Sequence, residues 1–338
     1  MSEPLAAGRF CPPDYRISPD TYNALEPHSA DVLYVAGGLY GNTEALAEIE
    51  RLYALDVSAV GADRCDLVFN GDFHWFDASI EAFAEIHQRT SAYYRLRGNV
   101  ETELARENDS AAGCGCAYPD SVSDQDVAWS NQIIALLATV GRQAIGADAM
   151  QAMSKLPVTA KWQVADCAVA ITHGDHESLA GWSFAQDRLA QTWADGLADQ
   201  MQAWNIDIFA CSHTCLPVAQ SYEQASRAYA VVNNGAAGLA NARGMAGGIV
   251  TRIARSGVAK PPVEPLYSAR IGSCEVSALP VNQDETSWQQ KFLSIWPEHS
   301  AAHSAYFARI VHGPDYSLDE AARGRFSLSP NTYRTGNE

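Results

Sequence analysis

Residues 66–72, Asp-Leu-Val-Phe-Asn-Gly-Asp, decide the fold, because a short apolar run ends there in a glycine and a carboxylate. Such a run is typical of a buried β-strand. Similar runs occur at residues 31–37 and 93–99, and stretches with helical spacing separate the three. A strand, loop and helix repeated three times within about seventy residues indicate an α/β fold.

The rest of the chain continues this alternation. Asn42 is positioned to cap the first helix, because its side chain can accept a hydrogen bond from the first helical turn. We divide the chain into a lead-in over residues 1–30, an α/β domain over 31–275 and a helical appendage with a tail over 276–338. The periodicity predicts helices over 42–52, 76–86, 127–140 and 189–204, and strands over 158–164, 167–172, 206–210, 230–232 and 249–253.

Composition excludes several classes of protein. The 338 residues carry 23 lysines and arginines against 40 aspartates and glutamates, and a net charge of −17 argues against a nucleic-acid partner. An apolar fraction of 47% excludes a disordered chain. No apolar run reaches about 18 residues, so we expect no membrane-spanning helix. The first ten residues lack a signal segment, which favours a cytoplasmic protein.

Unusual polar side chains occur where the predicted strands end. Asp72, Asn99, His173 and His213 each follow an apolar run. Ligands of open α/β sheets bind beyond the carboxyl ends of the strands, so these side chains are expected to converge. A carboxylate, an amide oxygen and two imidazoles suit one divalent transition metal, either zinc, iron or manganese. The pattern therefore predicts a metal site.

The order of these motifs resembles that of the calcineurin-like metallophosphoesterases. The matches are Gly71-Asp72, Gly98-Asn99-Val100-Glu101, His173-Gly174 and Ser212-His213-Thr214-Cys215, over roughly residues 31–236. The resemblance implies a four-layer α/β/β/α sandwich and a metal-dependent phosphatase or phosphodiesterase. It also implies that Asp72, Asn99, His173 and His213 hold one of the family's two metals.

The chain departs from the family pattern at the other metal. Gly38-Leu39-Tyr40 stands where the family has Asp-x-His, and Cys215 stands where it has a second histidine. In the replacement of the first motif by Gly37-Gly38-Leu39-Tyr40-Gly41-Asn42, the chain resembles a divergent bacterial subgroup. Thiolates bind zinc or iron, so Cys215 and the nearby Cys114 and Cys116 are candidate replacement ligands. A reversible redox pair and exposure to solvent are the alternatives for Cys114 and Cys116.

Further residues are candidates for catalysis or substrate binding. Beside Asp72, these are His74 and His176, which lie close in sequence to predicted ligands, and Arg97, whose guanidinium suits a phosphate or carboxylate. Tyr40 and Asn42 are candidate substrate-binding residues. The chain has no Gly-x-Ser-x-Gly motif and no phosphate-binding loop, and Gly37-Gly-Leu-Tyr-Gly41 is only a partial match to a dinucleotide loop.

These observations predict a metal-dependent hydrolase that acts on a small phosphoester-type substrate. Two alternatives stay open at this point. One is a metal- or thiol-dependent enzyme that acts on a substrate other than a phosphoester, and the other is a non-catalytic binder of a metal or small ligand. The expected partner is a small molecule, and a homo-oligomer is compatible with the sequence.

Overall fold

The apolar run that ends at Asp72 forms β3 (Cys65–Asn70), which pairs in parallel with β2 (Val32–Ala36) and β4 (Tyr94–Leu96). The structure is a computed structural model that describes residues 7–106 and 112–330. All five residues of β2 are buried, because β10 and β3 flank this strand and other layers cover both of its faces. The continuous apolar runs of the sequence are therefore explained by burial on both faces.

The described residues contain two seven-stranded sheets. One has the order β1-β5-β6-β7-β9-β8-β13 and the other β14-β11-β12-β10-β2-β3-β4. Besides β2, β3 and β4, the strands of these sheets are β1 (His28–Ala30), β5 (Thr159–Val164), β6 (Cys167–Thr172), β7 (Ile208–Cys211), β8 (Pro217–Gln224), β9 (Arg227–Asn234), β10 (Gly248–Arg255), β11 (Tyr267–Ile271), β12 (Cys274–Val281), β13 (Ala322–Arg323) and β14 (Ser327–Leu328).

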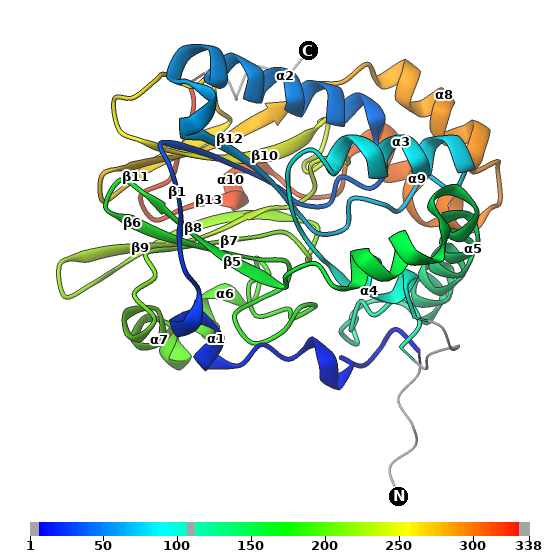
Figure 1. Ribbon diagram of the computed structural model, residues 1–338, viewed down its shortest axis with the longest axis horizontal. Coiled ribbons are helices and arrows are strands. Elements are labelled where there is room, and N and C mark those ends of the chain that lie inside the picture. Colours follow the sequence, from blue (N-terminus) through cyan, green and yellow to red (C-terminus); the bar gives the residue numbers. More distant parts are fainter. Residues whose placement is uncertain (1–6, 107–111, 331–338) are drawn as a thin grey trace, which may run out of the picture.

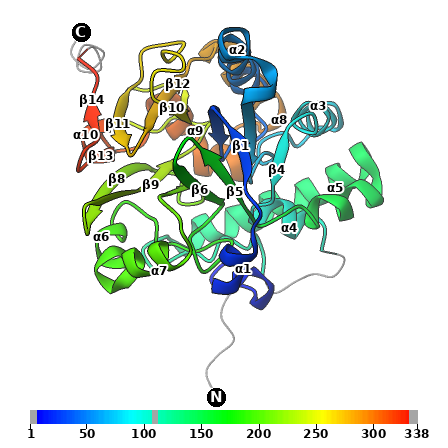
Figure 2. The ribbon, with the colours of Figure 1, turned by 60° about the vertical axis from the view of Figure 1, so that its left-hand side comes forward.

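The two sheets pack face to face, and helices cover their outer faces (Figures 1 and 2). Val35 and Val68 of one sheet share an apolar core with Val169 and Ile208 of the other. The prediction of a four-layer α/β/β/α sandwich is confirmed. The helices are α1 (Pro19–Ala24), α2 (Thr43–Val60), α3 (Ile80–Thr90), α4 (Asn99–Leu104), α5 (Asp124–Ser154), α6 (Leu189–Thr192), α7 (Ala198–Ala203), α8 (Glu285–Ile295), α9 (Ala301–His312) and α10 (Leu318–Ala321).

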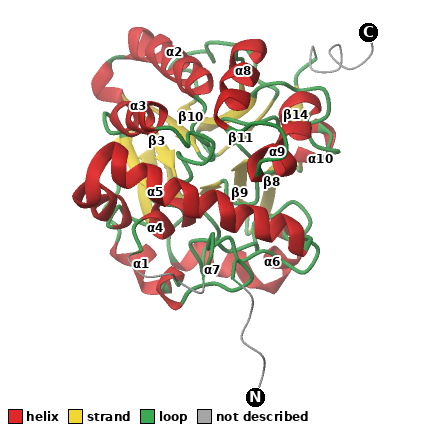
Figure 3. Ribbon diagram, turned by 90° about the vertical axis from the view of Figure 1, so that its right-hand side faces the viewer, coloured by secondary structure: helices red, strands yellow, loops and turns green. Residues whose placement is uncertain are grey.

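The long helix α5 crosses the molecule beside α3, α4 and α9 (Figure 3). By length and composition alone it could cross a membrane, although the sequence has no uninterrupted apolar run of that length. Its backbone leaves helical geometry at Gly146, where φ is 80° and ψ is 163°. Within the fold, α5 contributes Ile133, Leu137 and Met150 to the apolar core outside the β2–β3–β4 sheet.

The two boundaries that we placed at residues 30/31 and 275/276 stay predictions. β1 belongs to the predicted lead-in and pairs with β5 of the α/β domain. β12 runs across position 275 and pairs with β10 and β11. Residues 1–6 and 331–338, at the ends of the predicted lead-in and tail, lie outside the described residues.

Candidate metal centre

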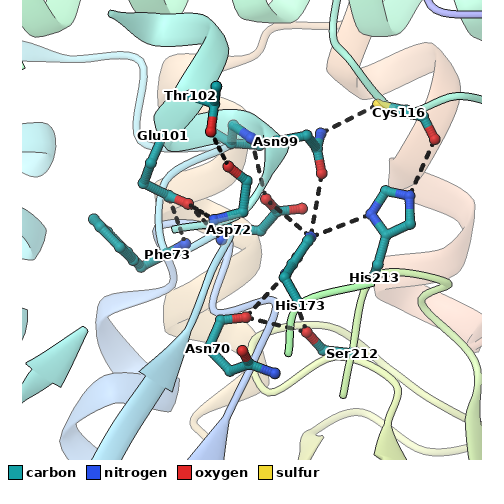
Figure 4. A network of polar contacts seen from close by, with 12 residues as sticks. Asn70, Asp72, Phe73, Asn99, Glu101, Thr102, Cys116, His173, Ser212 and His213 are labelled. Carbon is teal, nitrogen blue, oxygen red and sulfur yellow. Dashed lines mark hydrogen bonds and ion pairs between the residues drawn. The ribbon is translucent and has the colours of Figure 1, made fainter. Parts of the chain in front are cut away.

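Four strand ends bring the four predicted ligands together. Asp72 follows β3, Asn99 follows β4, His173 follows β6 and His213 follows β7. One ligand atom from each of Asp72, His173 and His213 lies within 4.8 Å of the other two. Asn99 Oδ1 lies 3.2 Å from His173 Nε2, so the amide oxygen faces the same point (Figure 4). The convergence expected from the sequence is present in the structure.

Backbone carbonyls determine which ring nitrogens can bind a cation. His173 Nδ1 lies 2.9 Å from the Asn70 carbonyl oxygen, and His213 Nε2 lies 3.0 Å from that of Cys116. A carbonyl oxygen only accepts hydrogen bonds, so both of these ring nitrogens carry the proton. His173 Nε2 and His213 Nδ1, which lie 3.2 Å apart, are then the lone-pair nitrogens of the neutral rings.

The centre thus brings together nitrogen and oxygen atoms that all carry lone pairs. A positive charge between these atoms would stabilise the arrangement. Asp72 Oδ1 lies 3.4 Å from His173 Nε2, on the same side as Asn99 Oδ1. Burial opposes the charged form of His173, but the Asp72 carboxylate outweighs this effect and raises the pKa of His173. Burial, reinforced by the neighbouring His173, lowers the pKa of His213 to about 4. Either a proton on His173 Nε2 or a metal cation fits this arrangement, and the donor set suits a transition metal.

Glu101 holds two of the ligand loops together, a role that we did not predict. Its buried carboxylate accepts hydrogen bonds from the backbone N–H groups of Asp72 (2.9 Å), Phe73 (3.1 Å) and Gly98 (2.8 Å). The loop after β3 is thereby fixed to the start of α4. The sequence does contain a signal, because a glutamate three residues after Gly98 fits the capping pattern of a helix N-terminus.

The backbone at the centre approaches the ligands too closely for side chains. A Cβ atom at Gly98 would overlap the Asp72 carboxylate and lie 2.9 Å from His173 Nε2. Asp72 itself has a φ of 52°, a conformation that is uncommon for residues other than glycine. Strained backbone of this kind is concentrated at functional sites.

Cys114 and Cys116 form a disulfide with each other, so in this structure neither offers a free thiolate to a metal. They contact the predicted ligands through backbone oxygens, and Cys116 Sγ also lies 3.5 Å from Asn99 Nδ2. The Cys114 carbonyl accepts a hydrogen bond from Asn99 Nδ2 at 3.0 Å, and the Cys116 carbonyl accepts one from His213. The segment therefore orients two ligands, and its predicted role as a replacement ligand pair is not seen.

Cys215 pairs with Tyr40 rather than with the four-ligand cluster. The Tyr40 hydroxyl lies 2.8 Å from Cys215 Sγ, and the thiol also donates to the His213 carbonyl at 3.2 Å. Burial raises the pKa of Cys215, which favours the thiol over the thiolate. Tyr40 and Cys215 nevertheless line the same pocket as Asp72, Asn99 and His213.

This pocket has a volume of about 290 Å³ and opens onto the metal centre. Its walls combine aromatic and polar side chains, and α9 lines one side. The aromatic side chains that line it are Tyr40, Trp75, Tyr118, Trp182 and Tyr306. A cavity of this size admits a small organic molecule.

Two predicted residues that follow strands of the β2–β3–β4 sheet, His74 and Asn42, do not line the pocket. His74 is fully buried, with Nδ1 2.6 Å from Asp77 Oδ2 and its ring stacked on Phe83 at a centroid distance of 3.7 Å. Asn42 caps α2 as expected, since its Oδ1 accepts from the N–H groups of Glu44 and Ala45. Its amide group donates to Gly238 and Gln283. Packing and capping explain both residues, and neither lines the pocket.

Arg97 and His176 are also absent from the pocket walls. Arg97 Nη1 donates to the carbonyl of Ser154 at the end of α5. His176 is 6% exposed and stacks on Phe184 at a centroid distance of 5.4 Å. The structure therefore does not bring either side chain to the metal centre, because each packs on a neighbouring element.

Comparisons with known proteins identify the fold. No protein-family model and no curated protein matches the sequence. A hypothetical protein from Pyrococcus horikoshii OT3 has a similar structure, with a TM-score of 0.56 and 12% identity over 84% of this chain and 99% of that chain. A metallophosphoesterase from Sphaerobacter thermophilus is similar with a TM-score of 0.50 and 14% identity, over 84% of this chain and 100% of that chain. The chain thus has a metallophosphoesterase-like fold.

Proposed function

We propose that this protein is a metal-dependent hydrolase that acts on a small phosphoester, with one metal held by Asp72, Asn99, His173 and His213. One observation carries the proposal. The lone pairs of two buried imidazoles and two side-chain oxygens converge on a single point beside a pocket. The metallophosphoesterase-like fold supports phosphoesters as the substrate class.

Each residue of the centre has a distinct task in this proposal. His173 and His213 hold the metal with nitrogens whose direction is set by the carbonyls of Asn70 and Cys116. Asp72 supplies the charge that offsets part of the metal's own. A divalent metal here would act as a Lewis acid on the phosphoryl oxygen and make a water molecule more acidic.

The surrounding pocket limits the size of the substrate. Trp75, Trp182 and Tyr306 form apolar walls beside the centre. A cavity of about 290 Å³ favours a small ester over a polymer. The net charge of −17 agrees with this preference, because a polyanion would be repelled at long range.

The test combines metal analysis with kinetics. Protein purified without chelator is analysed for zinc, iron and manganese, and a panel of phosphomonoesters and phosphodiesters is then assayed with each metal found. We expect about one metal per chain and turnover that is lost in His213→Ala. The control is His299→Ala, whose side chain is 90% exposed.

Two results would contradict the proposal. One is wild-type protein that binds no stoichiometric metal, and the other is turnover that persists in His213→Ala. A tightly bound metal without turnover on any phosphoester would favour the alternatives, a metal-dependent enzyme for another substrate or a non-catalytic metal binder.

A further inference from the structure

The pocket beside the candidate metal centre is also lined by a positively charged side chain, that of Arg309, which has no role in the proposed function so far. Among its lining residues in the described ranges, Arg309 is the only lysine or arginine. The chain as a whole has 23 such residues against 40 acidic ones, so a permanent positive charge in a small pocket is notable. Arg309 lies on α9, in the appendage that follows the predicted α/β domain.

Two backbone carbonyls hold the guanidinium in place. Arg309 Nε donates to the Ala240 carbonyl at 2.9 Å, and Nη2 donates to the Cys215 carbonyl at 2.6 Å. A guanidinium has five N–H groups in a planar fork, so further donors remain for a ligand. The second bond fixes Arg309 to the loop that carries the ligand His213.

Within the described residues, no carboxylate lies within 4.0 Å of the Arg309 guanidinium to neutralise it. The carboxylates that line the same pocket are Asp72 and Asp126. Asp72 belongs to the metal centre, and Asp126 accepts a hydrogen bond from Ser123 at the start of α5. The partners of Arg309 are neutral carbonyl oxygens. The positive charge of Arg309 is therefore available to an anionic ligand in the pocket.

We propose that Arg309 binds the anionic oxygens of the substrate's phosphoryl group, and that this group lies between the guanidinium and the metal centre. The inference rests on the proposed function and names the anion-binding residue of the same site. A guanidinium matches two phosphate oxygens at once, which a lysine cannot do. The aromatic walls then suit an ester group that is flat and apolar, as in a small aryl phosphate.

Inorganic phosphate is the probe, and its binding to the metal-loaded protein is measured by titration calorimetry. Arg309→Gln should weaken phosphate binding at least about tenfold, because a charge-assisted bidentate contact is lost. The KM for an aryl phosphate should rise by a similar factor, while the metal content stays unchanged. The matched control is Arg243→Gln, which removes an arginine whose side chain is 71% exposed and paired with Asp315.

Arg309→Lys provides a second variant, because it keeps the charge and loses the planar fork. Its phosphate affinity should lie between those of the wild type and Arg309→Gln, and thermal unfolding shows whether each variant folds. If the glutamine variant does not fold, the lysine variant must still bind phosphate more weakly than the control.

The outcomes separate this inference from the proposed function. Unchanged phosphate affinity and KM in Arg309→Gln would overturn the role of Arg309 even if the protein hydrolyses phosphoesters. A lysine variant that binds phosphate as poorly as the glutamine variant would also overturn it. Phosphate binding that depends on Arg309, in a protein without turnover, would support the anion site and contradict the hydrolase.

Discussion

Two pairs of neighbouring histidines, His173 with His213 and His74 with the half-buried His87, differ in their relation to the pocket, because among these four only His213 lines it. The rings of His173 and His213 lie 5.0 Å apart, and those of His74 and His87 lie 6.2 Å apart. In the first pair, backbone carbonyls bind the outer nitrogens, so the inner nitrogens face Asp72 and Asn99. In the second pair, His74 is bound by Asp77 and stacks on Phe83.

The difference indicates that proximity between histidines does not by itself define a candidate metal site. What defines it is the direction in which the lone pairs point, and the partner on the far side of each ring sets that direction. His74 follows Asp72 by only two positions, yet its ring packs against α3. The following experiments test this contrast.

The largest effect is expected from His173→Ala. The substitution removes the nitrogen that lies 3.2 Å from both Asn99 Oδ1 and His213 Nδ1, so bound metal should fall from about one equivalent to less than about 0.1. Elemental analysis after gel filtration measures the loss. His74→Ala is the matched control and should retain the metal. If His74→Ala also lost the metal, the contrast between the two pairs would fail.

Glu101→Gln should weaken metal binding without removing a ligand. The neutral amide is a weaker acceptor for the three N–H groups that fix the loops of Asp72 and Asn99, so we expect affinity to fall about 10- to 100-fold. Competition with a chromophoric chelator measures the affinity. Glu81→Gln, at an exposed position of α3, is the control. An affinity equal to that of the wild type would show that Glu101 only stabilises the fold.

Asp77→Ala should affect stability and leave the metal in place. It leaves His74 Nδ1 and the Trp75 N–H group buried without partners, at a cost of about 2–4 kcal/mol in the free energy of unfolding. Urea denaturation measures this cost. Asp77→Asn, which keeps an acceptor for Trp75, should lose less. Loss of metal in Asp77→Ala, in protein that remains folded, would connect His74 to the site.

The smallest effect concerns pH. Burial, together with nearby His74 and Arg95, lowers the pKa of His87 to about 4, against about 6.5 in an unfolded chain. Between these values the unfolded chain binds the extra proton, so this contribution to stability is lost as the pH falls from about 6.5 to about 4. His87→Gln should therefore lose less stability than the wild type between pH 7 and pH 5. Equal losses in denaturant titrations would contradict the shift.

The sequence was sufficient to predict the strands that form continuous apolar runs. Runs such as β2 and β6 are buried at every position, so they stand out as continuous apolar segments. Strands β8 and β11 are partly exposed, with polar side chains among the buried ones, and we did not predict them. Their pairing depends on tertiary contacts, which local periodicity does not report.

The same division applies to the site. The rule that polar residues gather at strand ends found Asp72, Asn99, His173 and His213 because it depends only on strand direction. It gave no information on ring orientation, so His74 and His176 were candidates as well. Arg309 was not predicted either, because α9 lies far from His213 in the sequence and reaches the pocket only through packing.

The most direct test of the central claim is X-ray absorption spectroscopy of the zinc-loaded protein. We predict a first shell of nitrogen and oxygen atoms at about 2.0–2.1 Å, with outer-shell scattering from two imidazoles and no sulfur. This result corresponds to Asp72, Asn99, His173 and His213 as ligands, with Cys116 acting through its carbonyl and Cys215 as a thiol. A sulfur shell at about 2.3 Å would contradict the account, because it would place a cysteine among the ligands.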